Sequence, residues 1–182
     1  SEAPQNHEDL GYKSFLLGRA HLREAAGLMH ASSSSFDIAL KLLSARVKTE
    51  EALKDGYVNL ESLVQMADVC VQQLLNFYNG QQRMPVSKEL YEKIVHYFEE
   101  AVEIGDKEVR GTVSAKKSPV TVTPAVSYLV TVAEHLISGN LYKMFPQQYD
   151  KKFAGACAKI GGTLALAGVK DKRLDSLLSV SA

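Results

Sequence analysis

Apolar residues recur every three or four positions over most of the chain, which is the spacing of one face of an α-helix. Prolines stand at only five positions, so the periodic stretches are long and uninterrupted. In the second stretch, Leu40, Leu43, Val47 and Leu53 recur on one face. The pattern predicts seven helices. They cover approximately residues 9–30, 36–54, 60–77, 88–104, 124–145, 148–166 and 171–180.

Several of these helices are preceded by residues whose side chains can cap them. The serine run at residues 32–35 precedes the second helix, Asn59 the third and Ser87 the fourth. Ser and Asn oxygens accept hydrogen bonds from the first N–H groups of a helix, which have no partner inside it. Thr123-Pro124 opens the fifth helix, since proline suits the first helical turn. We therefore expect an all-α fold, a helical bundle of two packed three-helix units.

The segment 111–123 differs in composition from the helices on both sides. It reads GTVSAKKSPVTVT, which is rich in β-branched and basic residues, and Pro124 follows it. A short strand at 120–123 would have no partner strand in this sequence. The composition is typical of a linker, and it predicts a first helical unit at residues 1–110 and a second at 124–182.

The charge balance narrows the range of partners. The 182 residues include 21 Lys plus Arg and 21 Asp plus Glu, so no net positive field attracts nucleic acid. No stretch approaches the ~20 apolar residues that span a bilayer, and the N-terminal sequence SEAPQNHEDL lacks the features of a signal peptide. We expect a cytoplasmic protein without a transmembrane segment or a nucleic-acid partner, and peripheral membrane association stays open.

Residue types that carry chemistry are few and scattered. Cys70 and Cys157 both lie in apolar helical segments and are interpreted as reduced core residues. His21 and His30 have no third ligand nearby, and Glu92 with His96 is interpreted as a solvated pair one helical turn apart. The phosphate-binding, dinucleotide-binding and nucleophile-elbow motifs are missing. We therefore predict no enzymatic activity for this stretch of chain, no catalytic residues, no metal and no cofactor.

Two neighbouring segments resemble a known interaction module. Residues 59–77, NLESLVQMADVCVQQLLNF, and the later KELYEKIVHYFEEAVEI resemble helices two and three of an MIT (microtubule-interacting and trafficking) domain. Lys93, Val95, Tyr97 and Ala101 stand at the positions of the family's third-helix pattern. A second unit with YLVTVAEHL as its first helix makes the chain similar to the tandem MIT region of autophagy-initiating ULK-type serine/threonine kinases. The kinase domain would then lie outside this stretch.

The resemblance implies a module that docks amphipathic helical peptides of a regulatory or scaffold partner in autophagy or membrane trafficking. The candidate partner-binding groove lies between the helices that follow Asn59 and Ser87. Its predicted lining is Leu63, Met66, Val95, Phe98 and Val102. The alternatives are a cytosolic lipid carrier with an apolar cavity between its helices, and a structural subunit or enzyme of unfamiliar type.

Overall fold

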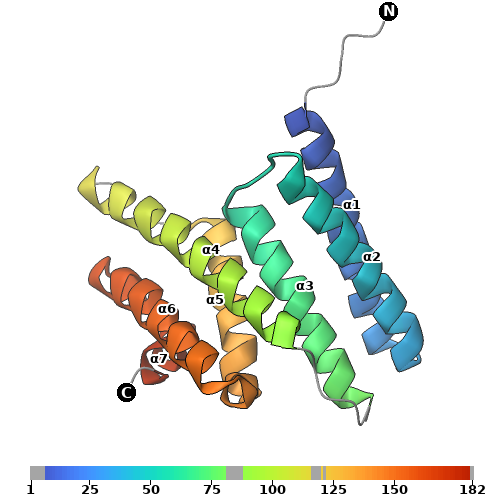
Figure 1. Ribbon diagram of the computed structural model, residues 1–182. Helices are drawn as coiled ribbons and strands as arrows, with labels where there is room; N and C mark the ends of the chain where they lie inside the picture. The colour runs from blue at the N-terminus through green and yellow to red at the C-terminus, as the bar shows by residue number, and fades with distance from the viewer. Residues whose placement is uncertain (1–6, 81–87, 116–119, 121, 181–182) are drawn as a thin grey trace, which may run out of the picture. The chain divides into compact units, whose positions relative to one another are not determined.

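The computed structural model describes residues 7–80, 88–115, 120 and 122–180, and over these residues the chain forms helices and no strand (Figure 1). The elements are α1 (His7–His30), α2 (Ser35–Lys54), α3 (Leu60–Asn79), α4 (Lys88–Ser114), α5 (Pro124–Ser138), the 3₁₀ helix η1 (Leu141–Met144), α6 (Gln147–Leu166) and α7 (Arg173–Ser179). The predicted all-α fold is confirmed. Within the described ranges, no helix is both long enough and apolar enough to cross a bilayer.

Two of the predicted helix caps form, at Ser34 and Asn59, and Thr123 caps α5 as well. The Oγ of Ser34 accepts from the Asp37 amide at 3.2 Å, and Thr123 Oγ1 accepts from the Val126 amide at 3.3 Å. Asn59 Oδ1 accepts from the Ser62 amide at 2.9 Å, and the Ser62 hydroxyl accepts in return from the Asn59 amide at 2.9 Å. The first N–H groups of α2, α3 and α5 are thus partnered locally. Ser87, the third predicted cap, lies outside the described residues.

Two predicted helix ends are wrong. Helix α4 continues past residue 104 to Ser114, because Asp106 and Val109 are buried and extend its inward face. Residues 111–114 are therefore helical rather than part of a linker, while 116–119 and 121 lie outside the described residues. The helix predicted at 124–145 is interrupted, because Asn140 adopts a left-handed backbone conformation with φ 54° between α5 and η1.

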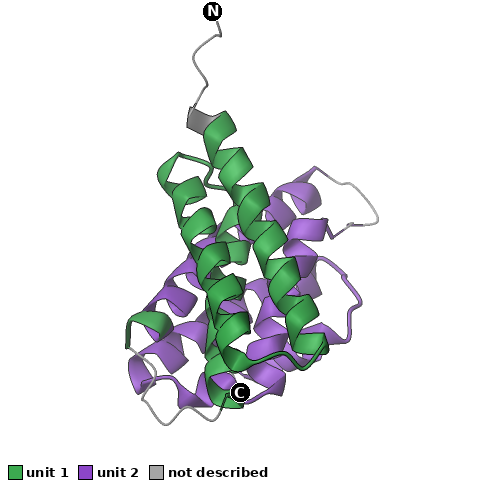
Figure 2. Ribbon diagram, turned by 90° about the vertical axis from the view of Figure 1, so that its right-hand side faces the viewer, with its two compact units in different colours: residues 1–90 green, residues 91–182 purple. Residues whose placement is uncertain are grey.

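The chain folds as two compact units, Ser1–Leu90 and Tyr91–Ala182, called unit 1 and unit 2 (Figure 2). The sequence placed the division one helix later, at residues 111–123. The difference arises because α4 packs on α6: the rings of Phe98 and Phe153 lie 5.1 Å apart, and the Tyr149 hydroxyl donates to Glu92 at 2.5 Å. The MIT resemblance assigns α3 and α4 to one unit, whereas here they fall in different units.

Unit 1 is an up-down-up arrangement of α1, α2 and α3. Lys41 pairs with Glu24 near one end of α1 and α2, and a Cβ on Gly18 would meet Thr49 near the other, so these two helices are antiparallel. A hydrogen bond from Asn76 to the Ser35 carbonyl at 3.0 Å fixes α3 antiparallel to α2. Helix α2 buries one face in this arrangement, whereas α3 is buried all round its axis from Ser62 to Val71.

Helices α1 and α2 approach closely because the residues between them are small. A Cβ built on Gly18 would lie 2.5 Å from Thr49 Oγ1, which only glycine avoids. Across the same contact Gln65 donates its amide to Thr49 Oγ1 at 3.0 Å and to the Phe15 carbonyl at 3.1 Å. This buried polar group ties all three helices of unit 1 together.

Unit 2 contains α4 from Tyr91 onward, together with α5, η1, α6 and α7. Glu92 pairs with Tyr149, Glu103 with Lys159, and Asp106 with Thr163. The residue numbers of these contacts therefore rise together along α4 and α6. Helices α4 and α6 are thus parallel, and α5 connects them. Helix α7 packs on α5 and α6, where Arg173 donates to the Ser127 carbonyl at 3.0 Å.

Candidate functional site

Helix α2 in unit 1 carries apolar residues on two opposite faces. One face is buried and consists of Ile38, Leu42, Ala45, Thr49 and Ala52. The other face, called the outer face of α2, consists of four residues that remain 70, 49, 52 and 44% exposed: Phe36, Leu40, Leu43 and Val47. The spacing i, i+4, i+7, i+11 puts them in one row along three turns. Isolated exposed leucines are ordinary, but a continuous row of large apolar side chains indicates an interaction surface.

The size of the side chains explains which face of α2 turns inward. Ala45, Thr49 and Ala52 are small enough for the close approach to α1, where Gly11 and Gly18 lie against α2. A built Cβ on Gly11 would already lie 3.2 Å from the Ala52 carbonyl oxygen. Leucine and phenylalanine side chains do not fit at that distance, because a packed helix pair has no voids to receive them. The bulky row is therefore left facing outward.

A hollow of about 290 Å³ opens beside the outer face of α2. It is lined by His21 of α1 together with Leu43, Ser44, Val47 and Lys48 of α2. The Nδ1 atom of His21 is buried and has no hydrogen-bond partner. The hollow interrupts the outer surface next to the two apolar residues Leu43 and Val47, so it offers space for one large side chain of a bound molecule.

Three cations of α2, Lys41, Arg46 and Lys48, are paired with carboxylates within the chain. Lys41 pairs with Glu24 at 2.5 Å, and the hydrogen bond from Lys41 lowers the pKa of the Glu24 carboxyl. Lys48 pairs with Glu51 at 3.0 Å, and Arg46 with Glu50 at 3.1 Å. Because these charges already have partners, recognition at the outer face of α2 depends on apolar contact rather than on a field of one sign.

The five residues predicted from sequence to bind a partner are all buried, at most 2% exposed. Leu63 and Met66 lie on α3 in unit 1, whereas Val95, Phe98 and Val102 lie on α4 in unit 2. Each set shares one helix, and the two sets belong to different units. The predicted groove between them stays a prediction, but Val102 also lines a groove between α4 and α6.

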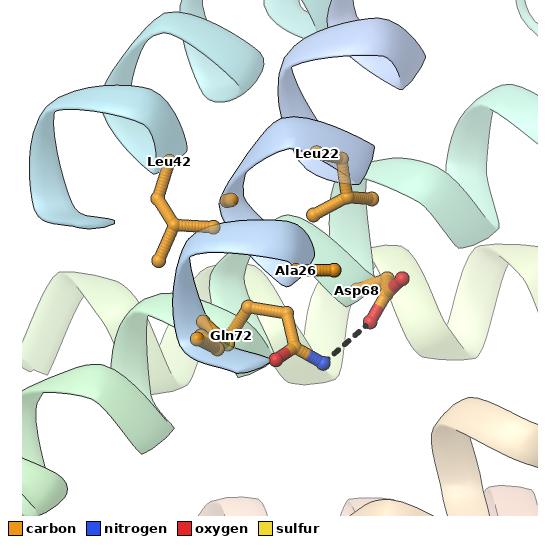
Figure 3. A pocket seen from close by; sticks show the side chains of 7 residues that line it. Leu22, Ala26, Leu42, Asp68 and Gln72 are labelled. Atoms are coloured by element: carbon orange, nitrogen blue, oxygen red, sulfur yellow. Dashed lines mark hydrogen bonds between the residues drawn. The ribbon is translucent and has the colours of Figure 1, made fainter. Parts of the chain in front are cut away.

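Figure 3 shows a second hollow in unit 1, with Leu22 and Ala26 of α1, Leu42 of α2, and Asp68 and Gln72 of α3 around it. Gln72 Nε2 donates to Asp68 Oδ1 at 3.2 Å. Its volume is about 120 Å³, well below the ~300 Å³ at which pockets for organic ligands begin. A buried carboxylate on its wall also disfavours an acyl chain, so this hollow gives the lipid-carrier alternative no support.

The groups with potential chemistry do not converge. Cys70 and Cys157 are free and buried, as predicted, and burial raises the pKa of the Cys157 thiol, which keeps it protonated. The predicted pair of Glu92 with His96 is wrong: His96 Nε2 lies 3.2 Å from Glu100 Oε1 instead, and Glu92 accepts from Tyr149. In the described part of the chain, no three His, Cys, Asp or Glu side chains gather as metal ligands would.

Comparison of the chain with protein-family models, curated proteins and solved structures finds no match. The function is therefore argued from the surfaces themselves. The outer face of α2 was missed as a site by reasoning from sequence, although Leu40, Leu43 and Val47 were recognised as one stripe. The signal was present, since a helix with a second apolar stripe at 38, 42, 45 and 52 buries only one of the two in a three-helix unit.

Proposed function

We propose that this chain is a protein-interaction module that binds an amphipathic helix of a partner protein along the outer face of α2. The observation that carries the proposal is the row of four large apolar side chains that the fold leaves exposed at residues 36, 40, 43 and 47. A partner helix with apolar residues at the same spacing can place them between and beside these four.

The length and composition of the row suit a short helical segment. From Phe36 to Val47 the row covers roughly 16 Å at 1.5 Å per residue, which corresponds to three turns of a partner helix. Complete burial of a Leu or Phe side chain contributes about 1.5–3 kcal/mol. About half of Leu40, Leu43 and Val47 is already covered, and association has its own entropic cost, so the contact supports a modest and reversible affinity.

The identity of the partner comes from the MIT resemblance alone. That resemblance assigns the partner helix to a regulatory or scaffold protein of autophagy or membrane trafficking. The ion pairs beside the row add a physical constraint, because three of the cations of α2 are already neutralised by carboxylates of the chain. Binding at this face should therefore change little between low and high salt.

The test uses a fluorescent 18-residue peptide helix with leucines along one face and alanine and glutamine elsewhere. Binding is measured by fluorescence anisotropy with the full chain and with the double variant Leu40→Asp/Leu43→Asp. Two carboxylates in the row should weaken binding at least tenfold, because they would have to be desolvated on contact. Ala20→Asp, at an exposed position of α1, is the matched control and should bind as the unmodified chain does.

Light scattering on the same samples separates a partner helix from a second copy of this chain. The proposal expects a monomer at the concentrations of the binding assay. A dimer that dissociates in the Leu40→Asp/Leu43→Asp variant would instead show that the outer face of α2 pairs with itself, and the proposal would be wrong. Equal peptide affinity for the double variant and for Ala20→Asp would also contradict it.

A further inference from the structure

A groove runs between the parallel helices α4 and α6 of unit 2. Its volume is about 380 Å³, and its floor is formed by Val102 of α4 with Gly155 and Ala156 of α6. Val102 and Ala156 are buried, whereas Gly155 is exposed. The groove therefore has an apolar floor, and the exposed Gly155 makes part of that floor accessible from outside.

The two edges of this α4–α6 groove carry opposite charges. The α4 edge consists of the carboxylates of Glu99, Glu100 and Glu103, and the α6 edge carries the ammonium groups of Lys152 and Lys159. Glu103 and Lys159 pair with each other across the groove and Glu100 pairs with His96, so Glu99 and Lys152 carry the charges that are most available to a ligand. The fold thus places an acidic edge and a basic edge on either side of one apolar floor.

Gly155 lies on the floor without being required by the packing of unit 2. A glycine inside a helix costs about 0.5–1 kcal/mol relative to alanine, yet a Cβ at Gly155 would meet no atom within 4 Å. Gly161 on the same helix differs, since its Cβ would lie 3.3 Å from Leu177 Cβ in α7. The missing side chain at Gly155 leaves the backbone of α6 open to close approach from outside.

We infer that the α4–α6 groove is a second docking site, whose occupant is an amphipathic partner helix with one basic edge and one acidic edge. Its apolar face covers Val102, Gly155 and Ala156, its basic edge lies along the glutamates of α4, and its acidic edge lies along the lysines of α6. This inference extends the proposed interaction function to other residues, so either site can fail alone.

The opposite edges also fix the direction of the bound helix. A helix turned end over end in the groove would place its basic edge beside Lys152 and Lys159, and like charges held side by side oppose binding. A helix with the same charge on both edges meets repulsion from one edge in either direction. The groove therefore selects both the charge pattern and the polarity of its partner.

Three peptides of one length and one leucine pattern test this selection. The first has lysines on one edge and glutamates on the other, the second has lysines on both edges, and the third has glutamates on both. Calorimetric titration of the full chain at low salt should give the mixed-edge peptide at least fivefold higher affinity than either of the others. This preference should shrink at high salt, because exposed charges are screened there. Equal affinities of the three peptides would overturn the inference.

Two variants locate the binding. The charge exchange Glu103→Lys/Lys159→Glu keeps an ion pair across the groove but mixes the charges on both edges, so the mixed-edge peptide should lose its fivefold preference while the unfolding midpoint stays the same. Gly155→Leu fills the floor without meeting any atom of the chain at its Cβ, and it should weaken binding of the mixed-edge peptide at least tenfold.

The double variant Leu40→Asp/Leu43→Asp separates this site from the outer face of α2. Because the outer face of α2 can also bind a helix with leucines on one face, the three peptides are titrated again in this variant, where the mixed-edge peptide should still bind the groove with its fivefold preference. Loss of binding in that variant, or unchanged binding in Gly155→Leu, would assign the peptide to another surface and overturn the inference. Neither result depends on whether the leucine-faced peptide binds to α2.

Discussion

The outer face of α2 and the α4–α6 groove leave room for a helix in different ways. On α2 the apolar residues themselves project into solvent and the charges beside them are paired along the surface of unit 1. In the groove the apolar floor is recessed and the charges stand at its edges. The outer face of α2 can bind any helix with an apolar face. The α4–α6 groove also selects the charge pattern of the bound helix and the direction in which it lies.

The difference follows from the side chains between the packed helices. In unit 1 small residues at positions 45, 49 and 52 bring α2 close to α1, and the second row of large residues on α2, at positions 36, 40, 43 and 47, stays outside. In unit 2 large rings fill part of the space between α4 and α6, as in the contact of Phe98 with Phe153, while Gly155 leaves its surface empty. Close packing of helices thus leaves a surface without a partner in two ways. On α2 a row of large side chains is excluded from the contact, and on α6 a missing side chain leaves the helix surface uncovered.

The largest expected change in unfolding free energy tests whether α2 has one face that belongs to the core and one that is free to bind. Leu42 is fully buried and Leu43, its neighbour, is half exposed. Leu42→Ala should lower the free energy of unfolding by about 2–5 kcal/mol, because it leaves a cavity. Leu43→Ala should change it by no more than about 0.5 kcal/mol. Urea denaturation followed by circular dichroism measures both. Similar losses for the two variants would mean that the outer face is part of the core.

A smaller change in stability is expected from the polar contacts that join α4 and α6. Thr163 donates its hydroxyl to Asp106, and Arg110 donates to Asp106 Oδ2 at 2.9 Å and to Thr163 at 3.3 Å. Asp106→Ala removes the shared acceptor in a buried place and should cost about 1–3 kcal/mol of unfolding free energy. Glu103→Ala, which breaks the exposed pair with Lys159, should cost at most about 1 kcal/mol. An equal loss of unfolding free energy in the two variants would show that the buried hydrogen bonds of Asp106 stabilise the fold no more than the exposed ion pair of Glu103.

The same carboxylate predicts a dependence on pH. Burial by itself would raise the pKa of Asp106, but the hydrogen bonds from Thr163 and Arg110 and the charge of Arg110 bring it below the usual value of about 3.9. A pKa lowered by folding stabilises the folded state above the unfolded value, and this contribution is lost as the pH falls through the folded value. The stability difference between the unmodified chain and Asp106→Ala should be constant near neutral pH and shrink below about pH 4. A difference that grows on acidification would have the wrong sign.

The sequence was sufficient for the helices because their signals are local. The caps at Ser34 and Asn59 depend on residues three positions apart and formed as predicted. The break after α5 had a local signal too: Gly139-Asn140 suits a left-handed turn, and that signal was overlooked. The end of α4 was placed too early because the burial of Val109 depends on the tertiary packing.

The candidate surfaces were harder to predict because they depend on which helices are neighbours. Periodicity found the stripe of Leu40, Leu43 and Val47 but does not tell whether another helix covers it. The α4–α6 groove depends on a parallel alignment that brings Glu103 beside Lys159, far apart in sequence. The burial of Val102 agrees with its apolar character, yet its place beside Gly155 follows only from the fold.

The smallest expected change in stability comes from replacing either of two glycines of α6. The comparison tests whether packing within the chain requires Gly155 on the groove floor. Gly155→Ala should raise the free energy of unfolding by about 0.4–1 kcal/mol, because alanine favours the helix and restricts the unfolded chain. Its methyl group would meet nothing within 4 Å. Gly161→Ala has the same intrinsic gain, but its Cβ would lie 3.3 Å from Leu177 Cβ, so α7 must shift and the gain should be smaller or reversed. Urea denaturation of the two variants side by side makes the comparison. A loss of stability in Gly155→Ala would mean that packing within the chain requires this glycine, and the groove floor could no longer be assigned to an outside partner.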